Sequence, residues 1–317
     1  MADLIHCITN PISMNLCANA VLSLGAKPIM AEHPREVKEI TAGAQALLLN
    51  LGNISDTRME AMRISFAEAL EKEIPVVIDA VGVACSKLRR EFFFELLSEK
   101  NKSDKSCIAA NKELPGKEEV PAHETLDRKV LLIKGNYSEI KALADCTYKS
   151  RGVDAEGGDT ADEMADIAQN LSKKLTAFIL ATGKRDIITD GNMVFLNDSG
   201  HQMMSMVTGT GCMLGAICAT FLAREASVNS VVKACTLFGI AGEKAAGGLE
   251  AEDEKSAGGL GSENERVIGR YGSEGERVGT GSFQVALLDE LYFSYEEDQE
   301  KDRTVQCPCG QMQVAKA

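Results

Sequence analysis

The chain has 317 residues, 44% hydrophobic and 26% charged, which is enough apolar material for one large core without division into separate domains. Its net charge of −13 argues against nucleic acid as a partner, because no Lys/Arg-rich block offsets it. The amino terminus has no basic stretch followed by an apolar segment, and the apolar run 212–223 is too short to span a bilayer. We therefore expect a cytoplasmic protein that makes no membrane contact.

The ten cysteines are scattered at irregular spacings through a chain large enough to have its own core. We expect reduced thiols rather than disulfides. Cys307 and Cys309 form the one tight pair, but no second cysteine pair or nearby histidine completes a tetrahedral zinc site. We interpret this pair as an incidental feature of the tail, with metal binding as the lesser alternative.

Short apolar runs that end in glycine or a polar residue recur along the chain, and each predicts a buried strand. They lie at 46–52, 75–82, 130–136 and 177–183. Helical stretches separate them, among them 56–73 and 160–175, and the second opens with a Thr160/Glu163 capping-box pattern. This alternation predicts an α/β fold with a mostly parallel central sheet covered by helices on both faces. Its ligand sites should lie beyond the carboxyl ends of the strands.

Residues 186–198 contain two strand-like runs around an Asp-Gly-Asn turn, which predicts an antiparallel hairpin at the edge of the sheet. Residues 100–129 and 250–278 are polar and rich in charge or glycine, so we expect two mobile loops inserted into the fold. The predicted organisation is a single domain over residues 1–295, followed by a disordered tail at 296–317.

The glycine-rich segment 207–213 leads into an apolar stretch that is compatible with a helix. Glycines at such a point let the backbone approach an anion, and the free N–H groups of the first helical turn stabilise negative charge. We predict that Thr210, Gly211 and Cys212 form an anion hole for phosphate. The alternative is a structural turn before a core helix, which the threonines and the cysteine at the helix start make less attractive.

Cys212 is the candidate catalytic residue of this segment. A thiol at a helix amino terminus has its thiolate favoured by the helix dipole, and it could accept a proton from a substrate alcohol. The alternative is an inert buried cysteine, which the nine other cysteines make reasonable. Its position favours the functional interpretation.

Two carboxylates and one lysine stand at predicted strand ends. Glu139 follows the strand at 130–136 and Asp79 closes the apolar run PVVID at 75–79, where their oxygens could reach magnesium or its water shell. Lys134 lies just before Glu139 and could neutralise phosphate charge. Taken alone, Glu139 could be a helix cap, Asp79 a turn former and Lys134 a solvated surface residue.

Six segments, taken in order, resemble those of hydroxyethylthiazole kinases and span most of residues 5–293. They are HCITNPISMNLCANAVLSLGAKPIMA, PVVIDAVG, IKGNYSEIKAL, ATGKRDIITDG, VTGTGCMLGA and GTGSFQVALLDELY. The VTGTGCM segment is shared in outline with hydroxymethylpyrimidine phosphate kinases, whereas ITN and GTGSF favour the thiazole family. The resemblance implies a ribokinase-like fold, a homotrimer with active sites between subunits, and ATP- and Mg²⁺-dependent phosphorylation of 4-methyl-5-(2-hydroxyethyl)thiazole in thiamine salvage.

The resemblance also implies roles for individual residues. Asn10 and Met30 correspond to thiazole-site residues, Gly209 to the site of the substrate alcohol, Lys134 and Thr182 to ATP contacts, Asp79 and Glu139 to the magnesium-side carboxylates, and Cys212 to the catalytic base. Without the resemblance, we would interpret Met30 as a residue that fills a gap in the core and Asn10 as a turn residue.

The chain departs from the family pattern at three positions near the phosphate side. Ala80 and Ala84 stand where proline and glycine are usual, and Lys134 stands where arginine is usual. A Cβ at position 84 excludes the positive-φ conformations that glycine permits. Two alternative functions stay open: a kinase for a related small alcohol such as hydroxymethylpyrimidine, and a weakly active paralogue that binds nucleotide or thiazole.

Overall fold

The computed structural model describes residues 2–98, 130–145, 148, 160–255 and 279–305. Its centre is an eight-stranded sheet with the order β2-β1-β3-β4-β5-β6-β7-β8. The strands are β1 (Leu4–Ile8), β2 (Lys27–Ile29), β3 (Ala46–Asn50), β4 (Val76–Asp79), β5 (Leu131–Asn136), β6 (Phe178–Thr182), β7 (Asp186–Thr189) and β8 (Val194–Asn197). Neighbours from β2 to β6 pair in parallel, and the hairpin of β7 and β8 completes the sheet in antiparallel pairing.

The predicted strands are confirmed. The four apolar runs correspond to β3, β4, β5 and β6, and the predicted edge hairpin corresponds to β7 and β8. Every residue of β3 and β4 is buried, as expected for strands of a parallel sheet with both faces covered. The strands β1 and β2 were not among the predicted elements.

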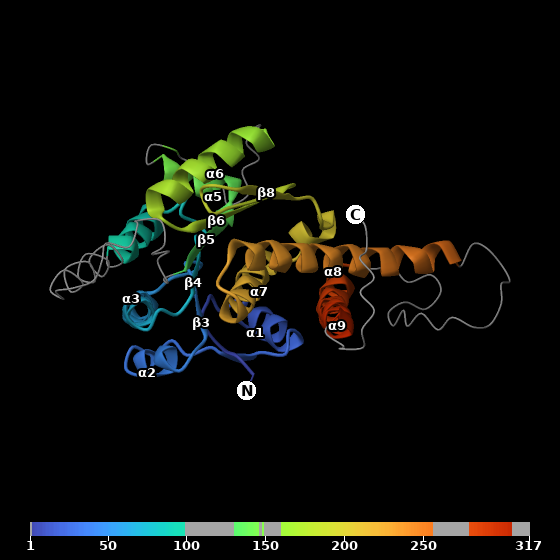
Figure 1. The fold of residues 1–317 in the computed structure, drawn as a ribbon, viewed down its shortest axis with the longest axis horizontal. Coiled ribbons are helices and arrows are strands. Elements are labelled where there is room, and N and C mark those ends of the chain that lie inside the picture. The colour runs from blue at the N-terminus through green and yellow to red at the C-terminus, as the bar shows by residue number, and fades with distance from the viewer. Residues whose placement is uncertain (1, 99–129, 146–147, 149–159, 256–278, 306–317) are drawn as a thin grey trace.

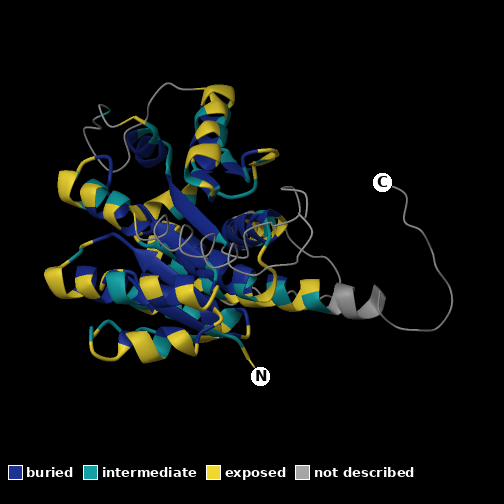
Figure 2. Ribbon diagram, turned by 60° about the vertical axis from the view of Figure 1, so that its left-hand side comes forward, coloured by how far each residue is buried: buried dark blue, intermediate teal, exposed yellow. Residues whose placement is uncertain are grey.

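Helices cover both faces of the sheet (Figure 1). One face packs against α1 (Met14–Ser23), α7 (Thr210–Arg224), α8 (Val228–Lys255) and α9 (Thr280–Val305). The other packs against α2 (Val37–Ala42), α3 (Asp56–Glu71), helical residues 87–98, α5 (Tyr137–Ala144) and α6 (Ala161–Leu175). A short 3₁₀ helix, η1 (Gln202–Met206), precedes α7. Figure 2 shows the buried strands between helices whose outer faces are exposed.

Two predicted boundaries in the carboxyl-terminal third are wrong. The polar segment expected to begin at residue 250 starts within α8, which continues to Lys255, and ten residues of the expected tail, 296–305, belong to α9. Glutamate, alanine and lysine have high helix propensity, and α8 and α9 pack against each other, so these polar residues extend helices that are already formed. The expectations for 100–129, 256–278 and 306–317, including Cys307 and Cys309, fall outside the described residues.

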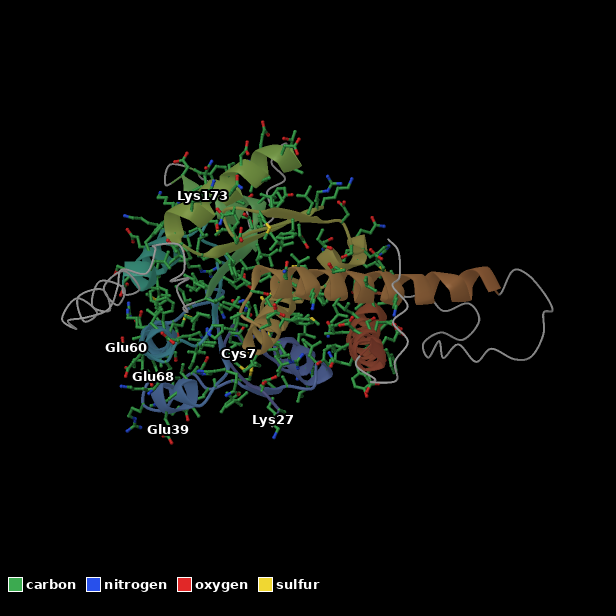
Figure 3. The ribbon with its side chains drawn as sticks, viewed as in Figure 1. Cys7, Lys27, Glu39, Glu60, Glu68 and Lys173 are labelled. Atoms are coloured by element: carbon green, nitrogen blue, oxygen red, sulfur yellow. The ribbon has the colours of Figure 1, made fainter. Side chains whose placement is uncertain are left out.

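The cysteines of the described part of the chain are free thiols, as predicted. Cys7, on β1, lies in the interior (Figure 3), and its side chain is buried. Cys85 is exposed and Cys212 is intermediate. Among the helices that the structure describes, none is long and apolar enough to cross a membrane.

Candidate active site at the carboxyl end of the sheet

Polar side chains line the carboxyl ends of four neighbouring strands. Asn10 lies two residues beyond β1, Asn50 is the last residue of β3 and Asp79 the last of β4. The parallel register pairs Asn50 with Asp79 and Asp79 with Lys134 on β5. The fold therefore places these side chains side by side at the edge where ligands of open α/β sheets bind.

Asp79 and Lys134 form an ion pair inside the protein. The Lys134 Nζ lies 3.0 Å from Asp79 Oδ1, and the two side chains are 4% and 0% exposed. Burial raises the pKa of Asp79 above its usual value, against the opposing effect of the Lys134 ammonium. Burial, the largest single effect, lowers the pKa of Lys134, but the neighbouring acidic groups, Asp79 foremost, together outweigh it and hold the pKa above its usual range. The 3.0 Å contact between two buried groups of opposite formal charge makes this a buried salt bridge.

Asn50 connects this ion pair to Asn10 and Cys212. Its Nδ2 donates to Asp79 Oδ2 at 3.0 Å, and its Oδ1 accepts from Asn10 Nδ2 at 3.2 Å. The Asn10 Nδ2 group also lies 3.5 Å from Cys212 Sγ. A continuous polar chain thus runs from the buried carboxylate of β4 to the thiol at the start of α7.

The amino terminus of α7 faces the same region. Gly209, the N-cap, has φ +99°, and a Cβ there would lie 3.1 Å from Leu16 Cδ1. The Thr210 hydroxyl donates to Met204 O, and its backbone N–H points to Val207 O at 3.5 Å. Gly211 lies close to Lys134, because a Cβ on it would be 3.7 Å from the Lys134 Nζ. The Thr210 N–H is thus directed within the turn, and the N–H groups of Gly211 and Cys212 are the ones at the start of α7 that suit an anion beside the buried ammonium.

Glu139 serves as a helix cap and also lies at the site. It forms a capping box with Asn136 at the start of α5, and its carboxylate accepts from the N–H groups of Asn136 at 2.8 Å and Gly82 at 2.7 Å. Burial raises its pKa to about 7, with the nearby Asp79 charge acting in the same direction and the two N–H donors opposing. The helix-cap interpretation is therefore confirmed, and the magnesium-side role of Glu139 stays a prediction.

The two carboxylates fit a magnesium ion that keeps most of its water. Each oxygen of Asp79 and Glu139 already accepts one protein donor, which leaves it lone pairs for a metal-bound water. No cluster of three His, Cys, Asp or Glu side chains that could enclose a metal occurs among the described residues. This donor set suits magnesium held mainly by waters and substrate phosphates.

The unusual alanines of the turn after β4 fit without backbone strain. Gly82 has φ +79°, but Ala84 is absent from the positive-φ positions, which among described non-glycine residues are Asn53, Glu73 and Thr176. Ala80 is fully buried, and its N–H donates to Lys134 O at 2.8 Å. The concern that position 84 requires glycine is therefore not supported.

Thr182 and Met30 stand apart from this hydrogen-bonded group. Thr182 ends β6, and its hydroxyl donates to Gly135 O at 3.4 Å, so it lies next to the Lys134 strand. Met30 follows β2 and packs, half-buried, against the core between the sheet and α1.

Asn50 is a site residue that the sequence analysis does not identify. Its signal is of the same kind as that of Asp79, because Asn50 closes the apolar run ALLLN as Asp79 closes VVID.

Comparison with known proteins identifies the relatives of this chain. The model of the hydroxyethylthiazole kinase family matches residues 1–113 and 118–262. Hydroxyethylthiazole kinase 2 of Clostridium botulinum strain Hall is 41% identical over 245 residues, which covers 76% of this chain and 82% of the relative. Hydroxyethylthiazole kinase of Methanobrevibacter smithii is 34% identical over 300 residues, covering 91% of this chain and 86% of the relative.

The solved structures agree with the sequence relatives. The hydroxyethylthiazole kinase protein of Pyrococcus horikoshii OT3 superimposes with a TM-score of 0.65 at 29% identity, covering 92% of this chain and 88% of that one. A ribokinase-like superfamily protein of Enterococcus faecalis V583 gives a TM-score of 0.52 at 14% identity over 92% and 87% of the two chains, a likeness in fold. The chain belongs to the hydroxyethylthiazole kinase family.

Proposed function

We propose that this chain transfers the γ-phosphoryl group of ATP to the hydroxyl of 4-methyl-5-(2-hydroxyethyl)thiazole, a step of thiamine salvage. The observation that carries the proposal is the meeting of Cys212, at the amino terminus of α7, with the Asn10 amide beyond β1 at 3.5 Å. A Cβ on Gly211, in the same helical turn, would lie 3.7 Å from the Lys134 Nζ. A thiol, an amide and a buried cation thus lie near one another at the carboxyl end of the sheet.

Phosphoryl transfer asks a protein mainly to align the groups and to stabilise charge. In the proposed reaction Asn10 and Met30 hold the thiazole, and the alcohol lies next to Gly209. Cys212, as the thiolate, accepts the proton of the hydroxyl while the alcohol oxygen bonds to the γ-phosphorus and the bond from that phosphorus to the β–γ bridging oxygen breaks, so that ADP leaves. The backbone N–H groups of the first turn of α7 form the anion hole, and Lys134 supplies positive charge beneath it.

The nucleotide would lie along the ends of β5 and β6, with Thr182 and Lys134 on the phosphate side. Asp79 and Glu139 would hold magnesium through its bound waters, and the metal, when bound, neutralises charge on the phosphates of ATP. The proposed compartment for this reaction is the cytoplasm, where ATP is available.

The proposed assembly is a homotrimer with an active site at each subunit boundary. Two large apolar side chains next to the site support it: Ile12, two residues after Asn10, is 68% exposed, and Met206, just before the glycine-rich segment, is 65% exposed. Apolar groups left open beside a polar site are what a neighbouring subunit would cover.

The first experiment measures ATP- and magnesium-dependent phosphorylation of hydroxyethylthiazole by the purified chain, with hydroxymethylpyrimidine as a parallel acceptor. Preferential turnover of the thiazole is expected. Preference for the pyrimidine would replace the proposed acceptor. Turnover of neither, with ATP still bound, would leave a binding paralogue as the better description.

Cys212→Ala tests the assignment of the base. We expect turnover to fall by up to about 10²-fold, the lower end of the range for positioned acid–base groups, because the proton leaves late in a loose transition state. Thiazole binding should stay measurable by calorimetry. Cys218→Ala is the matched control, since Cys218 lies on the same helix but in the core. Equal turnover in the two variants would remove Cys212 from the mechanism.

A further inference from the structure

Asn50 is a fully buried amide with three hydrogen bonds at the end of an otherwise apolar strand. Its Nδ2 donates to Asp79 Oδ2 at 3.0 Å. Its Oδ1 accepts from Gly52 N at 2.8 Å and from Asn10 Nδ2 at 3.2 Å. The backbone N–H of Gly52 can only donate, so Asn50 Oδ1 must face it, and this turns Nδ2 toward Asp79 Oδ2. These two partners fix which way the Asn50 amide faces.

The orientation of the Asn10 amide is fixed in the same manner. Its Oδ1 accepts from Ile12 N and Ser13 N, both at 3.1 Å. These backbone donors leave the NH₂ group of Asn10 to face Asn50 Oδ1 at 3.2 Å and Cys212 Sγ at 3.5 Å. Asn50 holds the amide from one side, so the second N–H is left to donate to the sulfur.

The close approach of the two amides depends on Gly52. A Cβ at this position would lie 2.8 Å from Asn50 Oδ1 and 3.0 Å from Asn10 Nδ2. Contacts this short would push the two side chains away from one another. The glycine after β3 therefore leaves the room that the amide pair occupies.

We propose that Asn50 is a positioning residue that locks the Asn10 amide so that its N–H donates to Cys212, thereby linking the buried Asp79 carboxylate to the thiol. The inference rests on the proposed function only in taking Cys212 as the base. The hydrogen bond from the Asn10 amide to the Cys212 sulfur does not depend on which substrate binds. A donor at the sulfur stabilises the thiolate, which is the reactive form. Asn50 itself touches neither the sulfur nor the reacting groups.

The test is the rate at which iodoacetamide alkylates Cys212, measured peptide by peptide by mass spectrometry in the absence of ATP and thiazole. In Asn50→Ala the rate should fall about threefold to tenfold, because the Asn10 amide is no longer held toward the sulfur.

A double-mutant cycle separates positioning from general loosening. In a chain that already carries Asn10→Ala, adding Asn50→Ala should change the Cys212 rate by less than about twofold, because the intermediary is gone. Exposed Cys85 reports reagent activity, and buried Cys7 reports unfolding, in every sample. If Asn50→Ala does not fold, Asn50→Ser replaces it, since a serine hydroxyl cannot span the distance to both Asn10 and Asp79.

An unchanged Cys212 rate in folded Asn50→Ala, or equal effects of that change with and without Asn10, would overturn the inference. Failure of the proposed function is a separate result, because alkylation requires no turnover. An active thiazole kinase with an unresponsive Cys212 would reject only the role of Asn50.

Discussion

Substituting either partner of the Asp79–Lys134 ion pair is expected to destabilise the fold. Both side chains are almost completely buried, and removing one partner of such a pair leaves an uncompensated charge that costs about 3–5 kcal/mol. A loss of activity after substitution of either residue would therefore report on folding as well as on chemistry. Substitutions at the rim of the site, where the backbone stays intact, are more informative.

Gly209 and Gly211 offer a matched comparison at that rim. Gly209 has φ +99°, and its Cβ would lie 3.2 Å from Ser13 Cβ, whereas a Cβ on Gly211 meets only Lys134 Nζ at 3.7 Å. We expect Gly209→Ala to lower kcat/KM by about tenfold or more, because left-handed backbone and close packing both oppose the side chain, and Gly209→Val to be worse. Gly211→Ala keeps its N–H and should retain activity within about threefold.

Steady-state kinetics on the three glycine variants, with thermal unfolding as a check on folding, would measure the difference. Full activity of Gly209→Val would refute the position of the anion pocket. Equal losses of kcat/KM in Gly209→Ala and Gly211→Ala would show that a Cβ at either position disturbs the pocket. The left-handed backbone of Gly209 would then not explain the effect.

Glu139 should make activity sensitive to pH near neutrality. Burial raises its pKa to about 7, and the proposed role needs the ionised carboxylate. The ionised fraction in the free enzyme falls as the pH drops below 7, so kcat/KM for ATP should fall by about tenfold per pH unit on the acid side. Measurements from pH 5.5 to 8.5 at fixed free magnesium test this. A flat profile down to pH 5.5 would mean that the carboxylate titrates lower or is not required.

The sequence places several of the candidate site residues because they lie at or near the carboxyl ends of strands. Asp79, Lys134 and Glu139 were identified from that position, and the register brings Asp79 and Lys134 into contact. The link through Asn50 was not predicted, because it depends on the register between β3 and β4 and on the space above Gly52, neither of which a single sequence specifies.

The capping box of α6 is a local element that the sequence identified in full. The Thr160 hydroxyl accepts from Glu163 N, and the Glu163 side chain accepts from Thr160 N at 3.1 Å. We expect Thr160→Ala to lower the free energy of unfolding by about 1 kcal/mol, because one first-turn N–H loses its partner. Thr160→Ser keeps the hydroxyl and is the control. Coincident urea transitions of Thr160→Ala and the parent would show that the cap contributes nothing.

Helix lengths were harder to predict than helix positions. A capping box and an apolar face define α6, but α8 and α9 continue into charged sequence that composition alone suggests is loop or tail. Each helix lies against the other, and helices extend cooperatively once packing has nucleated them. The ends of such helices depend on a tertiary partner, which local patterns do not contain.

The arrangement of the whole sheet places the chemistry at one edge of the molecule and leaves apolar side chains beside it. If three copies assemble around these surfaces, light scattering should give three times 34.0 kDa, about 102 kDa. Met206→Glu should weaken the assembly and lower specific activity on dilution, because a charge would be buried at the subunit boundary. Met193→Glu is the matched control, since Met193 is 50% exposed on the β7–β8 hairpin, away from the site. A fully active 34.0 kDa monomer would require each chain to complete its own site, and Ile12 and Met206 would then be left without a partner to cover them.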